Sequence, residues 1–505
     1  MATTVADAGF SPTPSVERRA GVSIGAAPQV PKSASVVGVP VAARGATPEA
    51  LGMARRRLGT VGFDAMVGST LALPSGDGPI HVGVGIGEAS ELDVAGLRNA
   101  AAAFARAAHP HARLAFLLDG VGTLAPDEAA QAVVEGVLLA RYRYDVLRRQ
   151  PKRSDVTRLT LVVDAEHKRG AASGAQRGRA FAAATQLARD LANTPHSHLT
   201  ASSLAEAATS LAADRGLDIE VFDKDALVEM GCGGLLGVNQ GSAEPPRMIK
   251  LTYRPSTEEP TGRLALVGKG IMYDSGGIAL KPGDEVHAQM KNDMSGAAAI
   301  LAAMAELSEL GCTNQVTGFL MCTDNMPSGT ALALGDVITM RGGTTVEVIN
   351  TDAEGRLVMA DALVLATEEP NDAIVDIATL TGACMRALGT QVAGVMGNDQ
   401  ALVDRLRAAA AAVDEPVWQL PLEQRYRKEL DSPVADLRNL GGANAGAITA
   451  ALFLAEFVGD VPWAHIDIAG TAQCPADSGW QTAGCSGFGA RLLLQLALDF
   501  AVSDA

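Results

Sequence analysis

Strand-like and helical segments alternate along most of this chain, and the alternation limits the folds that it can adopt. Between residues 34 and 162, short apolar runs such as SVVGVPVA, IHVGVGIG and RLTLVVDA are separated by Ala-rich stretches with helical spacing. From about residue 218 the pattern returns, with RLALVGKG, QVTGFLMCTD, AIVDIATL and WAHIDIAG among the expected strands. Several runs are apolar at every position, as is typical of central strands covered on both faces. The sequence therefore predicts an α/β fold.

A long Ala-rich stretch, GAQRGRAFAAATQLARDLANTP, separates the two alternating regions and meets Pro195. We expect it to form a linker helix over residues 176–195. A smaller N-terminal α/β domain is expected at 34–175, and a larger C-terminal catalytic α/β domain, with a mixed sheet flanked by helices, at 196–505. Residues 1–33 are rich in Ala, Ser, Pro and Val without periodicity, which predicts a flexible tail.

Composition and charge exclude several classes of protein. The chain is 48% hydrophobic, so global disorder is excluded. No apolar run is long enough to cross a bilayer, and the N-terminus lacks a basic start followed by an apolar core, so we expect no membrane association and a cytoplasmic location. The net charge of −16 argues against a nucleic-acid partner.

Basic clusters and cysteines have ordinary structural interpretations. The arginines at 55–57 and the stretch RYRYDVLRRQPKR at 141–153 lie beside helical apolar spacing, so we interpret them as solvated helix faces. The six cysteines form no CxxC pair, which favours reduced core residues over a disulfide or zinc framework. They are Cys232, Cys312, Cys322, Cys384, Cys474 and Cys485.

Charged residues are concentrated where expected strands end or helices begin. RLALVGKG ends near a lysine and an aspartate, TVEVI is followed by an Asp-x-Glu pair, and an Ala-rich helix follows MKNDM. Ligands of open α/β sheets bind at the carboxyl ends of strands, so we expect these side chains to converge. The set, in chain order, is Lys269, Asp274, Lys281, Asp293, Asp352, Glu354 and Arg356.

The carboxylates of this set indicate a metal centre. Asp352 and Glu354 repel each other unless positive charge lies between them. Four hard oxygen ligands suit divalent cations, and one nitrogen donor shifts the preference toward zinc. Each piece alone has a plainer interpretation, because an Asp-x-Glu at a strand end is usually a solvated turn and Lys269 between glycines is usually a surface residue.

Two other motifs do not indicate a site of their own. GKG is not a phosphate-binding loop, because Gly270 stands where that motif needs Ser or Thr. The three histidines at 196, 198 and 287 lack HExxH spacing, so we interpret His196, His198 and His287 as structural or surface residues, with His287 closest in sequence to the expected site.

The segments VGKGIMYDSGGIALKP, MKNDMSGAAA and NTDAEGRL together resemble the leucyl aminopeptidase family, the M17-type cytosolic di-metal aminopeptidases. Further similarity runs through ARDLANTP, ATLTGA and HIDIAGTA, and covers roughly residues 185–490. The resemblance implies a metallo-exopeptidase that hydrolyses the N-terminal bond of peptides, prefers large apolar residues such as Leu or Met, and assembles as a cytoplasmic homohexamer.

The resemblance also implies a role for each site residue. It makes Lys269, Asp274, Asp293 and Glu354 the ligands of one divalent ion, and Asp274, Asp352 and Glu354 those of a second, with Zn or Mn as the metals and Mg as an alternative at the looser site. Lys281 would stabilise the oxyanion, and Arg356 would hold a bicarbonate that acts as general base. The substrate pocket would be lined by Met290, Thr379, Leu380, Gly382 and Ala469.

One departure and two alternatives stand beside this interpretation. The segment from Lys281 to Asp293 is one residue longer than we expect for the family, in the loop that holds His287. A DNA-binding accessory role, known for some bacterial relatives, is disfavoured by the acidic balance. A catalytically inactive relative is disfavoured because all seven charged site residues are present.

Overall fold

The expected strands and helices form two compact units. A computed structural model describes residues 10–76, 78–150, 155–257 and 259–501. The N-terminal unit consists of residues 14–186 and 474–484, and the C-terminal unit of residues 10–13, 187–473 and 485–501. Each unit is built on its own β-sheet with helices packed on it, which confirms the predicted α/β class.

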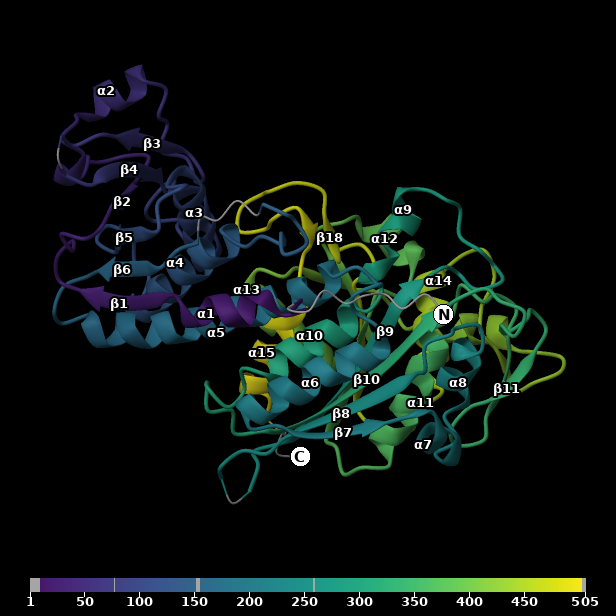
Figure 1. Cartoon of the computed structure of the whole chain (residues 1–505). Coiled ribbons are helices and arrows are strands. Elements are labelled where there is room, and N and C mark those ends of the chain that lie inside the picture. Colours follow the sequence, from purple (N-terminus) through teal and green to yellow (C-terminus); the bar gives the residue numbers. More distant parts are fainter. Residues whose placement is uncertain (1–9, 77, 151–154, 258, 502–505) are drawn as a thin grey trace. The chain divides into compact units, whose positions relative to one another are not determined.

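The N-terminal unit contains a six-stranded sheet in the order β1-β6-β5-β2-β4-β3. Figure 1 shows the strands side by side in this order. Only β3 runs antiparallel to its neighbour. The strands are β1 (Ser23–Ala27), β2 (Val36–Val41), β3 (Thr70–Leu73), β4 (Ile80–Gly85), β5 (Arg113–Leu117) and β6 (Arg158–Val162). The helices are α1 (Pro14–Ala20), η1 (Glu49–Leu51), α2 (Arg55–Thr60), α3 (Val94–Ala107), α4 (Pro126–Ala140) and the first part of α5 (Lys168–Asn193).

The predicted tail over residues 1–33 is wrong for its described part. Residues 14–20 form α1, and 23–27 form the edge strand β1, whose residues pair in parallel with β6 from Ser23 opposite Arg158 to Ala27 opposite Val162. The strand sequence SIGAA is only half buried and weakly apolar, so its strand character comes from the hydrogen bonds that β6 offers and not from its composition. Residues 1–9 lie outside the described residues.

The domain limits also differ from those expected. The linker helix, expected at 176–195, is part of the 26-residue helix α5 that begins at Lys168, and the division between the units falls within it, after Gln186. Residues 474–484, expected in the catalytic domain, belong to the N-terminal unit, where Trp480 is buried in the core with residues of α3 and α4. The sequence does not reveal that this short polar loop packs in the N-terminal unit, because a single buried aromatic residue, Trp480, anchors it there.

The C-terminal unit contains an eight-stranded mixed sheet in the order β15-β14-β17-β13-β9-β10-β8-β7. Its strands are β7 (Asp218–Phe222), β8 (Arg247–Tyr253), β9 (Arg263–Asp274), β10 (Gln315–Asn325), β13 (Ala373–Ala378), β14 (Ala393–Gly397), β15 (Val417–Gln419) and β17 (Trp463–Asp467). Small sheets are formed by β11 (Val337–Thr339), β12 (Thr345–Glu347) and β16 (Leu437–Arg438), and by β18 (Gln473–Cys474) and β19 (Gly484–Cys485). The helices are α6 (Ala201–Arg215), α7 (Lys224–Glu229), α8 (Gly233–Asn239), α9 (Glu285–Ala288), η2 (Met290–Asn292), α10 (Ser295–Met304), α11 (Gly355–Thr367), α12 (Gly382–Leu388), α13 (Gln400–Val413), η3 (Gln424–Leu430), α14 (Gly446–Ala455) and α15 (Ala490–Asp499).

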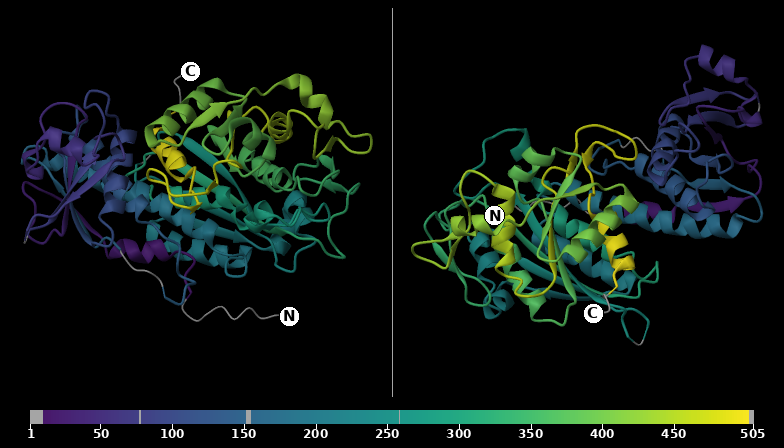
Figure 2. Two further views of the ribbon diagram at one scale, coloured as in Figure 1. Left: turned by 90° about the horizontal axis from the view of Figure 1, so that it is seen from above. Right: turned by 180° about the vertical axis from the view of Figure 1, so that it is seen from behind.

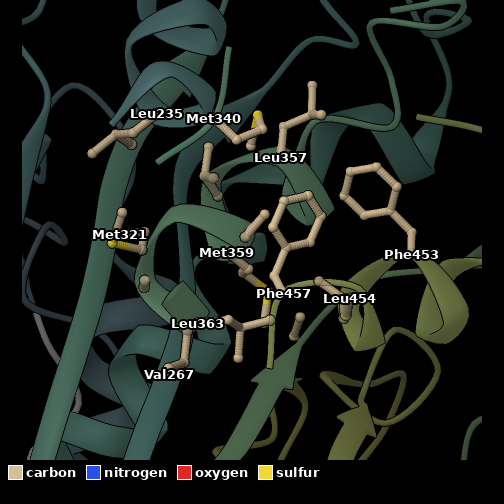
Figure 3. Packing of buried hydrophobic residues seen from close by; sticks show 14 of the residues in the cluster. Leu235, Val267, Met321, Met340, Leu357, Met359, Leu363, Phe453, Leu454 and Phe457 are labelled. Carbon is tan, nitrogen blue, oxygen red and sulfur yellow. The ribbon is translucent and has the colours of Figure 1, made fainter. Parts of the chain in front are cut away.

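Helices cover both faces of this sheet, as its uniformly apolar strands predict (Figure 2). Helix α10 is buried at every residue and packs between β9 and α15 on one face. On the other face, α8, α11 and α14 enclose a core in which Val267 and Met321 of the sheet meet Leu357 and Phe453 of the helices (Figure 3). The four parallel strands β17, β13, β9 and β10 therefore end together between two helical layers.

Two smaller predictions can also be compared with the structure. All six cysteines are buried and free, as expected. The basic stretch at 141–153 is not a helix face in its described part, because α4 ends at Ala140 and residues 141–150 follow as turns. No helix in the described ranges is both long and apolar enough to span a membrane.

Candidate active site

The predicted charged residues meet at the carboxyl ends of β9 and β10. Lys269 and Asp274 belong to β9, Asp352 and Glu354 immediately precede α11, and Asp293 lies between η2 and α10. Lys269 lies within β9, whereas each of the other positions is the end of a strand or lies close to the start of a helix. Carboxylates that are 19 to 80 positions away from Asp274 in sequence therefore lie near it in the C-terminal unit.

Lys269 connects two of the carboxylates. Its Nζ lies 2.7 Å from Oδ2 of Asp293 and 2.8 Å from Oε1 of Glu354, and it donates a 2.9 Å hydrogen bond to the carbonyl of Thr379. A Cβ at Gly355 would lie 2.6 Å from Cε of Lys269, so only glycine leaves room for the lysine stem. The NTDAEGRL motif thus supplies a carboxylate and, in the next residue, the space that the lysine needs.

Lys281 connects the other two carboxylates. Its Nζ lies 2.8 Å from Oδ2 of Asp274 and also contacts Oδ1 of Asp352. The lysine is partly exposed, with 17% of its side chain accessible, whereas Lys269 is buried at 3%. The two lysines therefore differ in access to solvent although both bind paired carboxylates.

The donor set fits a centre for divalent cations. One carboxylate oxygen from each of Asp274, Asp352 and Glu354 lies within 4.8 Å of the others, a spacing that one ion can bridge. Asp293 joins them through the amine of Lys269. Four carboxylates face two lysines here, so the cluster has an excess of negative charge that metal ions would neutralise.

The pKa values of these groups reflect burial and mutual repulsion. Burial, with Glu354 nearby, raises the pKa of Asp274 to about 6, and burial raises that of Asp293 to about 8. Burial alone would raise the pKa of Glu354 as well, but Lys269 and Lys281 lower it overall. Burial alone would lower the pKa of Lys281, but the surrounding carboxylates raise it, so this lysine stays charged at neutral pH.

Arg356 is buried beside this cluster without the partners that a buried guanidinium usually has. It is 4% exposed, and its Nε and Nη1 have no hydrogen-bond acceptor among the described residues. Burial lowers its pKa to about 10, although Glu354 and Asp467 act in the opposite direction. Buried N–H donors without a partner favour binding of an acceptor, so Nε and Nη1 of Arg356 are available to bind a small anion.

Three of the five predicted pocket residues, Thr379, Leu380 and Ala469, lie on two loops joined by Asp467. Its Oδ1 accepts hydrogen bonds from the backbone N–H groups of Leu380, Thr381 and Ala469, at 3.4, 3.4 and 3.1 Å, and its Oδ2 accepts from Oγ1 of Thr381 at 2.7 Å. Thr379 donates a 2.7 Å hydrogen bond to Oδ1 of Asp293, which ties the first loop to the charged cluster.

The other two predicted pocket residues each begin a short helix. Gly382 begins α12 and is exposed, and Met290 begins η2, three residues before Asp293. Asp467 itself was not predicted, although HIDIAGTA places it at the end of an expected strand, which is the signal that could have identified it.

Asn325 is a second residue that the sequence did not reveal. Its Nδ2 donates to Oδ1 of Asp274 at 2.8 Å and to the carbonyl of Thr351 at 2.9 Å, and lies 3.5 Å from Oε2 of Glu354. The residue follows TGFLMCTD at the end of β10, directly opposite Asp274 in the register of β9 and β10. Amides that orient metal ligands carry no charge signature, so only the pairing of the strands identifies it.

A third unpredicted feature is a buried polar chain under α11. Nδ1 of His465 contacts Oδ1 of Asp376, whose Oδ2 accepts a 2.7 Å hydrogen bond from Nε1 of Trp463. Asp376 raises the pKa of His465 against the effect of burial, while Arg356 lowers it. The group was invisible in the sequence because each member sits in an apolar strand.

Of the histidines interpreted as structural or surface residues, His196 and His287 lie beside the residue that precedes Asp274. Nδ1 of His196 is 3.5 Å from Oδ1 of Asp324, and the ring of Tyr273, the residue before Asp274, lies between His196 and His287 with centroid distances of 5.7 and 5.9 Å. His198 contacts the ring of Phe10.

The sequence matches known proteins along both units. Residues 186–494 match the model of the cytosol aminopeptidase family, catalytic domain, and residues 59–151 match that of the N-terminal domain of the same family. A probable cytosol aminopeptidase of Chlorobaculum tepidum is 47% identical over 74% of this chain and 75% of its own. Another, of Streptomyces avermitilis, is 44% identical over 88% of this chain and 89% of its own.

Solved structures agree with these matches. The structure called bottromycin maturation enzyme BotP in complex with Mn superposes with a TM-score of 0.84 at 39% identity, covering 92% of this chain and 99% of that one. Fold, site and sequence together define a hydrolase of the metal-dependent aminopeptidase class. The chain belongs to the cytosol aminopeptidase family.

Proposed function

We propose that this aminopeptidase works with two divalent ions and prefers peptides with a large apolar N-terminal residue, such as Leu or Met. The observation that carries the proposal is the arrangement of four buried or half-buried carboxylates around Lys269 and Lys281. One ion would be held by Lys269, Asp274, Asp293 and Glu354, and the other by Asp274, Asp352 and Glu354. Zn or Mn suits both positions, with Mg as an alternative at the all-oxygen position.

Bound there, such ions supply the Lewis acidity that polarises a scissile carbonyl and activates water. The protein's own residues then orient the reaction. Asn325 fixes one oxygen of Asp274 so that the other remains directed toward Lys281. The charged amine of Lys281 is the donor that meets negative charge developing on the carbonyl oxygen of the substrate.

Arg356 is proposed to hold bicarbonate as the general base. Its two unpartnered N–H groups favour a planar anion with two acceptor oxygens, and its burial excludes competing water. An anion held there would accept the proton of the attacking water and later pass it to the leaving amine.

The loop over residues 379–382, together with Ala469 and Met290, is proposed to form the pocket for the N-terminal side chain. Thr379 links this loop to Asp293, so a side chain seated on the loop would place the α-amine near the charged cluster. A requirement for the free α-amine at this place would restrict cleavage to the peptide bond of the first residue. Backbone groups at Leu380 are the proposed partners of the peptide itself.

The family assignment also supports two proposals beyond the single chain. We propose a homohexamer with peptides as substrates, and a cytoplasmic location in line with relatives named cytosol aminopeptidases. Sedimentation of the purified protein tests the assembly, because a mass of six chains of 51.8 kDa is well separated from that of smaller oligomers.

Metal analysis combined with a panel of aminoacyl-amides tests the proposal. We expect about two ions per chain in the active protein and faster turnover of Leu and Met amides than of Asp, Lys or Gly amides. A fully active protein with one ion per chain would contradict the two-ion proposal. A preference for charged residues would contradict the proposed pocket.

A further inference from the structure

A basic cavity in the N-terminal unit is unexplained by aminopeptidase activity. It has a volume of about 520 Å³ and is bordered by the end of α3, the turns that follow α4, and the 474–484 segment. Four arginines line it, Arg106, Arg141, Arg143 and Arg148, against two aspartates, Asp145 and Asp477. In a chain of net charge −16, such a local excess of positive charge is unusual.

Two of the arginines are held in fixed positions by backbone carbonyls. Arg106 donates to the carbonyls of Gly479 and Gln481, the latter at 2.6 Å, and Arg141 donates to those of Ala105 and His111 at 3.0 and 3.1 Å. Carbonyls are neutral, so these bonds orient the guanidinium groups without cancelling their charge. Burial lowers the pKa of Arg141, and the neighbouring Arg143 lowers it further, which shows that like charges crowd the cavity.

Each of the two aspartates lies near one arginine of the lining and has a further partner. Asp145 lies 3.0 Å from Arg18 and 3.9 Å from Arg143, so two cations share one carboxylate. Asp477 accepts a 2.9 Å hydrogen bond from the backbone of Ala483 and lies 3.8 Å from Arg106. Arg148 is exposed, and its side chain has no partner among the residues that the structure describes. It remains available to an incoming anion.

The size and shape of the cavity identify the class of ligand. Arginine clusters recognise phosphate through paired N–H donors. A volume of about 520 Å³ is typical of pockets for small organic molecules and far exceeds the space that one inorganic phosphate needs. Tyr142 and Tyr144 add aromatic surface to the lining, which suits a ring attached to the phosphate groups.

We infer that this cavity binds a phosphorylated small molecule of nucleotide size, with its phosphate groups between Arg148, Arg143 and Arg106. The site is separate in sequence from all the proposed catalytic residues, which lie between residues 269 and 469 of the C-terminal unit. Binding there therefore does not depend on the proposed mechanism.

Calorimetric titration of the full-length protein with ATP, pyrophosphate and inorganic phosphate, in buffer without added divalent ions, tests the inference. We expect ATP to bind at least about tenfold more tightly than inorganic phosphate, because only the larger molecule reaches the arginines and the tyrosines together. No binding of ATP at millimolar concentration would overturn the inference. Equal affinity for ATP and inorganic phosphate would also overturn it.

Two neighbouring arginines provide a matched pair of variants. Arg148→Glu places repulsion in the cavity, whereas Arg149→Glu makes the same change of charge at an exposed residue that does not line it. We expect Arg148→Glu to weaken ATP binding about tenfold or more and Arg149→Glu to change it less than about twofold. Equal effects would show that ATP binds elsewhere, for example at the metal centre, and would overturn the inference.

A third variant and a further probe complete the test. Arg143→Gln keeps a hydrogen-bonding side chain but removes the charge, and we expect it to weaken ATP binding severalfold while the thermal unfolding temperature stays near that of the wild type. A double-stranded oligonucleotide that bound with loss on Arg148→Glu, in the absence of ATP binding, would assign the surface to nucleic acid and overturn the small-molecule inference.

Discussion

The two units each contain a group of three acidic or histidine side chains close enough to hold a cation, and the two groups differ in surroundings. Asp164, Glu166 and His167 follow β6 and are exposed, and the nearest charged contact within the group joins His167 to Glu166 at 3.8 Å. Asp274 ends β9, Asp352 and Glu354 precede α11, and all three contact lysines, with Asp274 and Glu354 buried.

The comparison shows that proximity of carboxylates is not sufficient for a site. In water the charges of the first group are screened, and mobile side chains lose little by turning away. In the second group burial prevents this, so each carboxylate needs a cation or a proton, and the pKa of Asp274 rises to about 6. Burial converts a common surface pattern into a site that requires metal.

The sharpest test of this contrast replaces one carboxylate in each group. Glu354→Gln should lower kcat/KM by about 1,000-fold or more and reduce the metal content, because several kcal/mol of transition-state stabilisation depend on this ligand. Glu166→Gln should leave both quantities unchanged. Steady-state kinetics and elemental analysis on the same preparations measure the difference. Loss of activity in both variants would contradict the comparison.

Lys281→Ala should have the next largest effect. In the proposed mechanism, the charge that Lys281 meets develops only in the transition state, so the loss of this lysine should cost about 3 kcal/mol, roughly 100-fold in kcat, with a much smaller change in KM. Kinetics over a range of substrate concentrations separate the two constants. Activity within a few fold of the wild type would remove Lys281 from the mechanism.

Metal affinity should fall as pH decreases from 8 to 6. Protons compete for Asp293, with a pKa of about 8, and then for Asp274, with a pKa of about 6, so the affinity should drop by up to about tenfold per pH unit for each proton displaced. The metal-free protein should behave in the opposite way. Its folded state binds these protons more tightly than the unfolded chain does, so its stability should be lost as pH rises through the same values. Chelator competition and thermal unfolding measure the two trends, and a pH-independent affinity would contradict the assigned ligands.

Arg356→Ala should lower activity less than Lys281→Ala does, by about tenfold, because the proposed role of Arg356 is to hold an exchangeable anion and not to contact the reacting bond. Added bicarbonate should raise wild-type activity from a carbonate-free baseline and affect the variant weakly. Kinetics in degassed buffer with and without bicarbonate make the comparison. If neither protein responds, the base is another group.

The smallest expected effect is a difference between the two proposed metal positions in how readily each loses its ion. The position with the Lys269 nitrogen should hold zinc more tightly than the all-oxygen position. Mild chelation followed by metal analysis should therefore pause near one ion per chain, and added manganese should refill the empty position. Lys269→Met should narrow the difference, since it removes the distinguishing donor. Loss of both ions from the wild type at one rate would show that the positions are equivalent.

The sequence predicted the parts of the fold that are encoded by apolar periodicity. The uniformly apolar strands β9, β10, β13 and β17 and the Ala-rich helix α10 were predicted because burial on both faces leaves a continuous signal. The edge strand β1 was missed because its stability comes from β6, whose residues lie 135 positions further along the chain. The turns after α4 were interpreted as a helix face because they lie beside the helical apolar spacing of α4, and no local signal showed that the helix ends at Ala140.

The site residues likewise divide into those that the sequence predicted and those that it did not. Charged residues that follow apolar strands stand out in a sequence, and the structure brings Lys269, Asp274, Lys281, Asp293, Asp352 and Glu354 together in ion pairs. Neutral residues that orient them, such as Asn325, cannot be recognised until the register of β9 and β10 places Asn325 opposite Asp274. Their roles depend on geometry between strands, which no local pattern encodes.

The 474–484 segment also limits where recombination can exchange the two units between related chains. Trp480 is buried in the core of the N-terminal unit, its backbone N–H donates to Oδ1 of Asn99, and Arg106 binds the carbonyls on either side of it. A gene exchange with a single crossover near residue 187 would join one parent's α3 to another parent's segment around Trp480. The hybrid would then combine Trp480 from one parent with the surrounding core residues of the other parent. Recombination that keeps the residues of each unit together therefore requires two further crossovers, one on each side of residues 474–484.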